Sequence, residues 1–294
     1  MSDLITNQRA RTNLPNATST DDAAINTLIS AASKAIQRYC RRDFVATAYD
    51  ELYNGNGDRR LVLRQYPVIS VQSVRYRPAT VLKVINTNTT LNQQARVSVT
   101  ATGLTLTRVA GGTVSSNAVT FAANPTLNAL ATAVSAVGSG WSAQVVGDYG
   151  SWPAADLRGP QGALTAWGQF AELKLHTYEL ASYQIDEPRG WLLRAIPYTD
   201  PELLHPEDLV WPVGVNNFRV QFTAGYTTVP EDVQEACAAL VATWFAQRGR
   251  DLTLLSEATA RVYSYTADPG DQLPARVRAL LRPYRYQRVL NSQG

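Results

Sequence analysis

The residues that could act as acids or bases are few, and they lie far apart in the sequence. His176 and Glu179 are three positions apart, but the surrounding pattern is that of a β-strand, so their side chains are not expected to share a face. His205 lies in the sequence His-Pro-Glu-Asp, where Glu207 and Asp208 have the chemistry for acid–base catalysis. The simpler interpretations are solvated loop charges for this motif and a packing or surface role for His176.

Motifs for phosphate, dinucleotide, nucleophile and metal chemistry are absent from the sequence. None of the three lysines, Lys34, Lys83 and Lys174, follows a glycine, so there is no phosphate-binding loop. The glycine spacings of a dinucleotide fingerprint and of a serine nucleophile elbow are missing as well. The two histidines and two cysteines are too widely separated to form a zinc motif. We therefore predict that the protein is not an enzyme and has no catalytic residue, no cofactor and no metal.

Composition and charge set few limits on the partners. The chain of 294 residues has a formal net charge of +3, which does not by itself indicate nucleic-acid binding. Arginine supplies most of the positive charge, which reflects either genomic base composition or arginine-rich interfaces. Cys40 and Cys237 are predicted to be buried thiols rather than a disulfide. The sequence has no apolar run of ~18 residues and no signal peptide, so we expect synthesis in the cytoplasm and no membrane contact.

Two amphipathic helices are predicted to form the core of the fold. Residues 1–18 are polar and are expected to form an arm without a core face. Ser19 or Thr20 can cap a helix over residues 20–40, whose apolar side chains recur at helical spacing. A second helix is expected over residues 230–247. The side chains expected to be buried between these two helices are Ile29, Ile36, Leu240, Val241 and Trp244.

Strands are predicted on both sides of the middle of the chain. The sequence Asn-Gly-Asn-Gly at residues 54–57 is a strong hairpin signal, because Asn-Gly tolerates positive φ. It is expected to join strands over residues 49–53 and 61–63. Other strands are expected over residues 68–76 and 218–222, and strand character is expected over residues 172–193 with a turn at residues 186–190.

Residues 79–168 differ in composition from the rest of the chain. Charge almost vanishes there, while Thr, Ser, Ala, Val and Asn dominate. Short strands, one helix after Pro125 and a returning strand at residues 141–146 indicate a β-rich, ββαβ-like module. We predict that this autonomous module is inserted into a discontinuous core made of residues 1–78 and 169–294, with its two junctions close together. The predicted fold class is therefore α+β.

Six short segments are each a weak signal, but their order along the chain is informative when they are taken together. They are Tyr39–Phe44, Leu61–Leu63, Tyr66–Val71, Val220–Tyr226, Val229–Asp232 and Leu280–Arg285. Their order and spacing resemble the head–tail connector (head-completion adaptor) family of tailed bacteriophages. The resemblance covers roughly residues 19–78 and 170–290, and the module at residues 79–168 goes beyond it.

The resemblance implies a structural virion protein at the head–tail junction, or neck, assembled in the bacterial cytoplasm. In this family the subunits form a ring, usually a dodecamer, that docks under the portal, extends the DNA channel and gives a platform for the tail. The implied partners are further copies of the chain, the portal protein, the next neck or tail-completion protein and the genomic DNA. The implied fold is a small helical connector core with β-hairpin elements. The alternatives are another neck or tail ring component and, because of the six tryptophans, a carbohydrate-binding or hydrolytic protein.

The C-terminal segment, residues 270–294, is the predicted docking segment for the portal. From Pro274 onward it carries five arginines and no acidic side chain, with leucines and tyrosines among them. Arginine and tyrosine are favoured at the energetic centres of interfaces, and in connectors this segment reaches toward the portal. The alternative is a solvated basic tail that touches DNA nonspecifically. The candidate contact residues are Arg276, Arg278, Leu280, Leu281, Arg282, Tyr284, Arg285, Tyr286 and Arg288.

Overall fold

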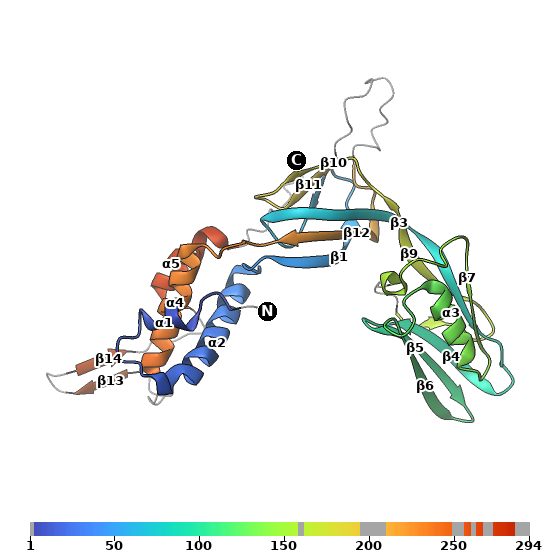
Figure 1. Ribbon diagram of the computed structural model, residues 1–294, viewed down its shortest axis with the longest axis horizontal. Helices are drawn as coiled ribbons and strands as arrows, with labels where there is room; N and C mark the ends of the chain where they lie inside the picture. Colours follow the sequence, from blue (N-terminus) through green and yellow to red (C-terminus); the bar gives the residue numbers. More distant parts are fainter. Residues whose placement is uncertain are drawn as a thin grey trace, which may run out of the picture.

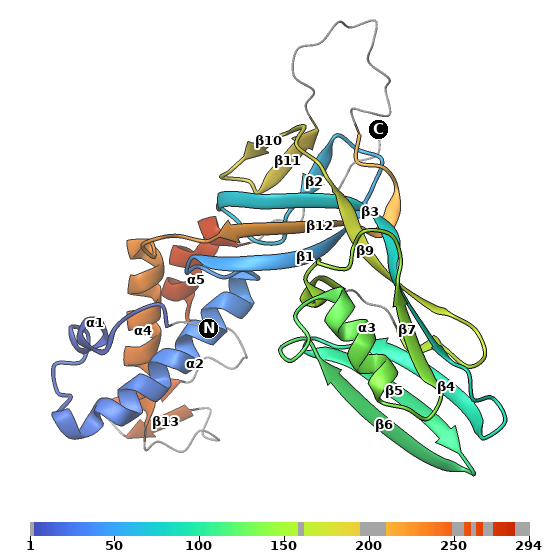
Figure 2. The same ribbon diagram turned by 45° about the vertical axis from the view of Figure 1, so that its right-hand side comes forward.

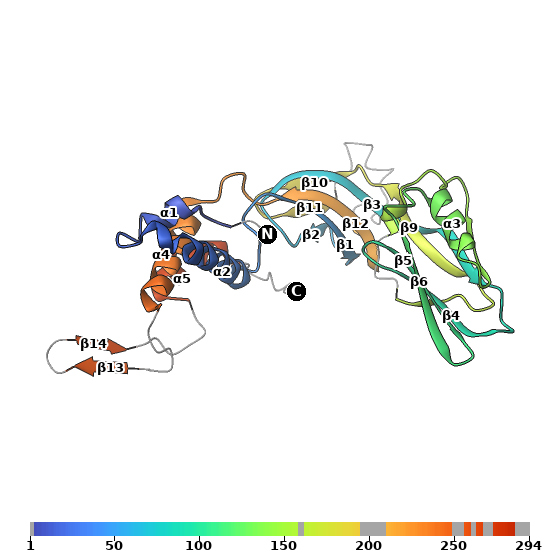
Figure 3. The same ribbon diagram turned by 60° about the horizontal axis from the view of Figure 1, so that its bottom comes forward.

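The computed structural model arranges helices and antiparallel sheets in three parts along its long axis (Figure 1). A helical bundle lies at one end, a sheet crosses the middle, and a β-rich module lies at the other end, so the predicted α+β class is confirmed. At the bundle end, β13 (Ser256–Thr259) and β14 (Tyr263–Thr266) pair as a hairpin (Figure 3). The structure describes residues 3–157, 162–194, 210–248, 256–259, 263–266 and 273–285.

The bundle is built from two long helices and two short ones. They are α1 (Asn7–Arg11), α2 (Asp22–Cys40), α4 (Glu231–Gln247) and α5 (Ala275–Leu281). The 3₁₀ turn η1 (Ser19–Asp21) precedes α2, and there Thr18 and Asp21 form a capping box. α2 ends where Arg41 adopts the left-handed conformation, with a φ of 56°. Local capping signals therefore set the bounds of α2.

α2 and α4 pack through their apolar faces, as predicted, except at the end of α4. Ile29, Ile36, Leu240 and Val241 are almost fully buried in their shared core. Trp244 packs against the same core but is only partly buried, which is less than the prediction gave it. It lies in the last turn of α4, the end of the helix that an ion pair between Arg248 and Asp21 joins to the start of α2. No helix within the described ranges is long and apolar enough to cross a membrane.

The polar N-terminal segment has a core face, contrary to the expectation from its composition. Leu4, Ile5, Ala10 and Leu14 are each less than a tenth exposed and join the core of the bundle. The backbone N–H of Leu4 also donates to Ser33 Oγ of α2 at 3.0 Å. A few well-placed apolar residues suffice here because α1 is short and turns only one side toward the longer helices.

A five-stranded antiparallel sheet connects the bundle to the module. Its strands are β1 (Thr47–Gly55), β3 (Val68–Asn86), β7 (Trp141–Val145), β9 (Ala171–Glu179) and β12 (Gly214–Ala224). β12 lies between β1 and β3, and the far half of β3 pairs with β7 and β9. Phe218, Val220 and Phe222 alternate along β12 and pack with Trp211 into the core of this sheet. β3 is thus a strand that reaches from the central sheet into the module.

The predicted hairpin at residues 54–57 was wrong, because β1 pairs with β12 instead. A separate three-stranded sheet consists of β2 (Arg60–Val62), β11 (Trp191–Arg194) and β10 (Tyr183–Asp186). The backbone N–H of Gly57 donates to the carbonyl of Trp211 at 2.8 Å, and Asn54 Oδ1 accepts from the backbone N–H of Asn216 at 2.7 Å. Asn54 and Gly57 therefore bind the start of β12 and the residue Trp211 before it, and these long-range contacts override the local turn preference.

The β-rich module is a four-stranded sheet with one helix against it (Figure 2). Its elements are β4 (Asn92–Val99), β5 (Gly103–Ala110), β6 (Thr113–Thr120), α3 (Leu127–Ala136) and β8 (Leu164–Thr165), with the strand order β6-β5-β4-β8. Three strands precede the helix, as the sequence pattern predicted. Leu106, Leu127 and Leu130 share one core with Val84 of β3 and Leu173 of β9. The core of the module therefore continues into strands of the central sheet.

Candidate docking surface at the helical end

The predicted docking segment folds back onto the bundle. Val277 and Leu281, on one side of α5, are 1% and 0% exposed in the core that α2 and α4 share. Leu280 is partly buried against the same core. Leu281, a candidate portal contact, is therefore an internal anchor of α5 in this conformation. Two further candidates, Tyr286 and Arg288, lie outside the described residues.

Tyr284 holds the docking segment at the junction between the bundle and the central sheet. It ends the 3₁₀ turn η5 (Arg282–Tyr284), which follows α5. Its ring centroid lies 5.9 Å from that of Phe44, just after α2, and 6.5 Å from that of Tyr226, just after β12. Burial and the carboxylate of Asp232 raise the pKa of Tyr284, whose hydroxyl donates to Asp232 Oδ2 at 3.4 Å. The ring of Tyr284 thus joins three segments that are distant in the sequence.

Arg42 completes this junction with a buried guanidinium. The residue is 5% exposed, and it donates a hydrogen bond to the carbonyl of Tyr66. Its Cζ lies 3.9 Å from the ring centroid of Tyr66, 5.3 Å from that of Phe44 and 5.5 Å from that of Tyr226. A desolvated contact between a cation and an aromatic ring contributes about 2 kcal/mol. Arg42 and its aromatic neighbours therefore hold the end of α2 against the central sheet.

The exposed part of the docking segment is basic. Arg276, Arg282 and Arg285 are exposed, and Arg278 is half-buried. Arg276 Nη2 lies 3.3 Å from a carboxylate oxygen of Glu235 on α4, so part of its charge is compensated within the bundle. The guanidinium of Arg285 lies 5.4 Å from the ring centroid of Tyr39, which places it beside the last turn of α2.

Arg285 thereby joins the exposed cations at the C-terminal end of α2. Arg38 and Arg41 are both exposed there, and residues 23–42 contain no acidic side chain. Arg282 begins the turn η5 and Arg285 directly follows it, so both belong to the segment that contacts the end of α2. Positive charge is also favourable at this end of a helix. We call Arg38, Arg41, Arg282 and Arg285 the basic surface.

Sequence reasoning missed half of the basic surface. The docking candidates were predicted in the C-terminal segment alone, so Arg38 and Arg41 were not among them. The two groups meet through the contact of Arg285 with Tyr39, which is tertiary. No local pattern in the sequence predicts the contact between Arg285 and Tyr39. The only signal in the sequence that could have grouped these residues is that all four are arginines.

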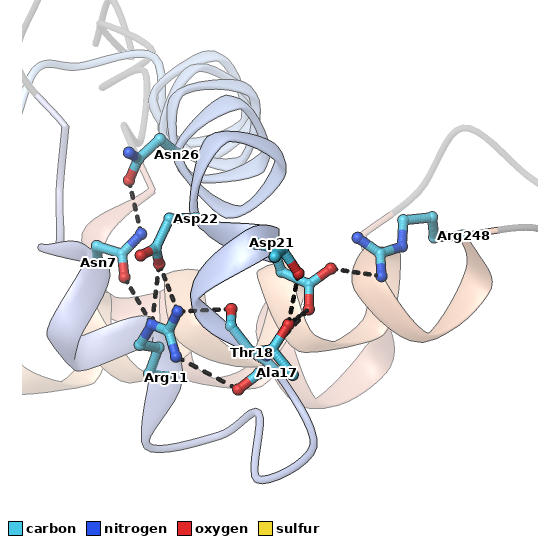
Figure 4. A network of polar contacts seen from close by, with 9 residues as sticks. Asn7, Arg11, Ala17, Thr18, Asp21, Asp22, Asn26 and Arg248 are labelled. Atoms are coloured by element: carbon cyan, nitrogen blue, oxygen red, sulfur yellow. Dashed lines mark hydrogen bonds and ion pairs between the residues drawn. The ribbon is translucent and has the colours of Figure 1, made fainter.

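Polar contacts fasten the opposite end of α2 to its neighbours (Figure 4). Arg11 donates to Asp22 Oδ1 through Nη2 at 2.6 Å and Nε at 2.9 Å, and to the carbonyl of Thr18 at 2.7 Å. Arg248, after α4, pairs with Asp21 at 2.9 Å. The backbone N–H of Thr18 and then Arg248 lower the pKa of Asp21. Charge-assisted hydrogen bonds therefore join α1, α2 and α4 at this end.

The candidates for acid–base chemistry are not assembled into a site within the described residues. His176 is 9% exposed, and its Nε2 lies 2.8 Å from the carbonyl oxygen of Asn216. Burial lowers the pKa of His176, which favours a neutral packing residue. No group of three His, Cys, Asp or Glu side chains in the described ranges could hold a metal ion. The motif residues His205, Glu207 and Asp208 lie outside those ranges.

Both cysteines are buried in the bundle as free thiols. Burial raises the pKa of Cys40 to about 11 and that of Cys237 to about 12. A thiol reacts as its thiolate, so these two side chains have the character of core residues rather than of nucleophiles.

Residues 3–131 match the model of a protein family described as head completion protein. The matched region runs from the N-terminal segment through β6 and into α3. It includes the part of the chain near residues 19–78 that carried the resemblance, and it extends into the module, which the resemblance did not cover. No curated protein matches the chain.

Three solved structures contain chains with a distant likeness to this one. One is described as the virion of a native gene transfer agent (GTA) particle, with 14% identity, a TM-score of 0.43, and coverage of 99% of this chain and 94% of that one. Another is the neck of an empty GTA particle computed with C6 symmetry, with 15% identity, a TM-score of 0.42, and coverage of 99% and 94%. The third is the neck of a native GTA particle computed with C12 symmetry, with 12% identity, a TM-score of 0.40, and coverage of 100% and 98%.

At TM-scores below 0.5 we infer nothing about function from these three structures. The family model is a comparison of sequence, and it agrees with the connector resemblance that the order of short segments indicated. The recognition made from the sequence is therefore confirmed: residues 3–131 of this chain match the head completion protein family.

Proposed function

We propose that this chain is a structural subunit of the head–tail connector in the neck of a phage-like particle. The observation that carries the proposal is the match of residues 3–131 to head completion proteins. The described residues are consistent with a structural role. The acid–base candidates among them are not assembled into a site, whereas a basic surface is exposed at the helical end.

The proposed assembly is a ring under the portal, twelve-fold as the resemblance implies, around the DNA channel. Contacts between identical subunits in a ring are heterologous and must close on themselves. The chain is elongated, with the bundle and the module at opposite ends (Figure 2), so neighbouring copies can meet along broad sides. In this arrangement the bundle faces the portal, and the other end is left for the next neck or tail-completion protein.

The basic surface is the proposed contact with the portal. Arg38 lies in α2, Arg282 begins η5, and Arg41 and Arg285 directly follow these two elements, so the backbone that carries all four guanidiniums is ordered before they bind. Arginine binds carboxylates through paired hydrogen bonds, so we infer an acidic surface on the portal. Nonspecific contact with the phosphates of packaged DNA is the alternative.

Charge reversal tests this contact. The double variant Arg282→Glu/Arg285→Glu should raise the dissociation constant for purified portal protein, without DNA, by about thirtyfold, the effect of losing about 2 kcal/mol at an interface centre. The control is Arg59→Glu/Arg96→Glu, an equal charge change at two exposed arginines outside the bundle. Biolayer interferometry measures both. Unchanged portal affinity in the first variant overturns the contact, and a loss confined to DNA affinity supports the phosphate alternative.

Removal of the docking segment is a less direct test. Truncation after Asp271 removes residues 272–294 of this segment and should abolish binding to the portal if the segment makes the contact. The structure places Val277 and Leu281 in the core of the bundle, so the truncation also removes buried anchors. Substitutions at exposed positions separate the loss of a contact from the loss of the fold.

A further inference from the structure

A groove of about 700 Å³ lies along β9, the strand that runs between the module and the central sheet (Figure 2). Its lining includes Lys174 and His176 of β9, Phe170 just before this strand, and Val215 at the start of β12. Phe170 and Val215 are 46% and 81% exposed, so two large apolar side chains are solvated here. We call this the β9 groove. Exposed apolar side chains beside a concave surface are typical of a site that binds another chain.

The β9 groove carries a net positive charge. Glu172 is the only carboxylate among the described residues that line it. Glu172 accepts a hydrogen bond from the hydroxyl of Thr80 at 3.1 Å and lies 3.4 Å from Lys83 Nζ, and these two contacts lower its pKa. Its charge is therefore compensated by Lys83, and Lys174 adds a second cation beside it. A carboxylate on an incoming chain would complement this charge.

The opposite face of β9 belongs to the core of the module. Successive side chains of a strand point to opposite faces, so Leu173 points away from the side that carries Lys174. Leu173 is fully buried in the core of the module, and the rings of Tyr149 and Trp152 pack against that core. The loop at residues 146–153, which carries both rings, therefore lies on the far side of β9 from the groove.

The loop and the groove lie at the same level of the ladder between β3 and β9. Lys174 in the groove pairs with Thr80 of β3. The loop begins next to this pair, because the backbone N–H of Val146 donates to the carbonyl of Val81 at 2.9 Å. Each copy of the chain therefore carries the groove and the loop at one level on opposite sides, which is the arrangement that a heterologous contact between copies requires.

The loop presents one carboxylate on an ordered backbone. Asp148 is exposed, and its side chain makes no hydrogen bond or ion pair within the described ranges. The rings of Tyr149 and Trp152 meet edge to face, with centroids 5.3 Å apart. The backbone N–H groups of Leu127 and Asn128, at the start of α3, each donate to a carbonyl of the loop at 3.0 Å. Little backbone entropy is therefore lost when the loop binds.

We propose that the loop at residues 146–153 of one copy enters the β9 groove of the next copy in the ring, where Asp148 pairs with Lys174. This inference rests on the proposed connector ring and names one contact between its copies. Charge complementarity identifies the occupant, because the chain itself supplies a carboxylate at the level of the groove. The contact joins two different faces, so it repeats from copy to copy and can close. It also covers the exposed side chains of Phe170 and Val215.

Charge reversal and its rescue test this contact in the full-length chain. Asp148→Lys and Lys174→Glu should each raise the concentration at which half of the chain is in rings by at least about tenfold, because like charges replace an ion pair. The double variant Asp148→Lys/Lys174→Glu restores opposite charges and should assemble close to the wild type. The control Glu187→Lys makes the same charge change at an exposed position between β10 and β11 and should assemble like the wild type. Sedimentation velocity with and without purified portal protein measures assembly, and negative-stain microscopy identifies closed rings.

Rings that neither single reversal weakens overturn the contact and leave the connector function standing. A double variant that assembles no better than the single variants overturns the pairing of Asp148 with Lys174. A wild-type chain that forms no ring, with the portal or without it, overturns the connector function and this contact together. Thermal melting confirms that the variants are folded. If Lys174→Glu does not fold, Val215→Asp takes its place with the same expected weakening, because it sets a second carboxylate against Asp148 at a largely exposed position.

Discussion

At the residue scale, a buried ion network joins the module to the central sheet. The Arg219 side chain is 4% exposed, and its Nη2 and Nε lie 2.7 and 2.8 Å from the two carboxylate oxygens of Asp50. The same Nη2 lies 3.0 Å from Asp156 Oδ1, which belongs to the 3₁₀ turn η2 (Ala154–Leu157) of the module. Arg75 contacts the other oxygen of Asp156 at 3.3 Å. Two arginines and two aspartates leave the network neutral, which offsets the cost of burying each charge.

Removing one partner should therefore leave Arg219 buried with too little compensation. We expect Asp50→Ala to lower the free energy of unfolding by about 3–5 kcal/mol, the usual effect of breaking a buried pair. The control is Asp186→Ala, which breaks a local pair with the largely exposed Arg189 and should cost at most about 1 kcal/mol. Urea denaturation of both variants measures the difference. Equal, small losses would contradict a stabilising role for the network.

The sequence could not predict this network, for a reason that applies to the basic surface too. The alternation of Phe218, Val220 and Phe222 predicts which face of β12 is apolar, but it does not tell what covers the opposite face. Arg219 finds its partners near residues 50 and 156, which meet only after β1 pairs with β12 and the module packs on the sheet. The partners of a charged residue depend on the tertiary structure, whereas the periodicity of apolar residues can be read directly from the sequence.

At the scale of elements, the sequence predicted the features that depend on neighbouring residues, such as the bounds of helices, and not those that depend on contacts distant in the sequence. The expected helices over residues 20–40 and 230–247 are α2 and α4 to within two residues, because apolar spacing defines both and caps bound α2. The hairpin at residues 54–57 failed because β1 and β2 each find a better partner far along the chain. The burial of Trp244, in the last turn of α4, was overestimated because helical periodicity gives the side of a helix that is apolar but not how far a neighbouring helix covers it.

The corrected packing predicts an order of stability effects in the bundle. Ile36→Ala removes a fully buried side chain and should cost about 2–5 kcal/mol. Trp244→Ala should cost less than the roughly 3–5 kcal/mol of a fully buried tryptophan, because its ring is partly solvated. Urea denaturation monitored by circular dichroism measures both. A larger loss for Trp244→Ala than for Ile36→Ala would mean that Trp244 is buried in solution.

At the scale of the whole molecule, the module and the central sheet share two strands. β3 runs into the module without interruption and β9 returns beside it, with pairs from Arg75↔Glu179 to Val84↔Ala171. The proposed insert, residues 79–168, begins inside this ladder, since Ala79 pairs with Leu175. The composition of the sequence shows where charged residues become rare, but it does not show where the pairing of β3 with β9 ends. If the module is an insert, its natural junction is therefore the last pair of the ladder.

We propose that replacing residues 85–170 with Asn-Gly leaves a folded connector core. The two residues form a tight turn that joins Val84 to Ala171, which already face each other. The core should still melt cooperatively, at a lower temperature, because Arg219 loses Asp156 and the buried Leu173 becomes exposed. Replacing residues 79–168 instead removes five of the eight residue pairs between β3 and β9, so the melting of that variant should be broader. Calorimetry compares the two variants with the full chain. A non-cooperative melt of the first variant would mean that the module is integral to the fold.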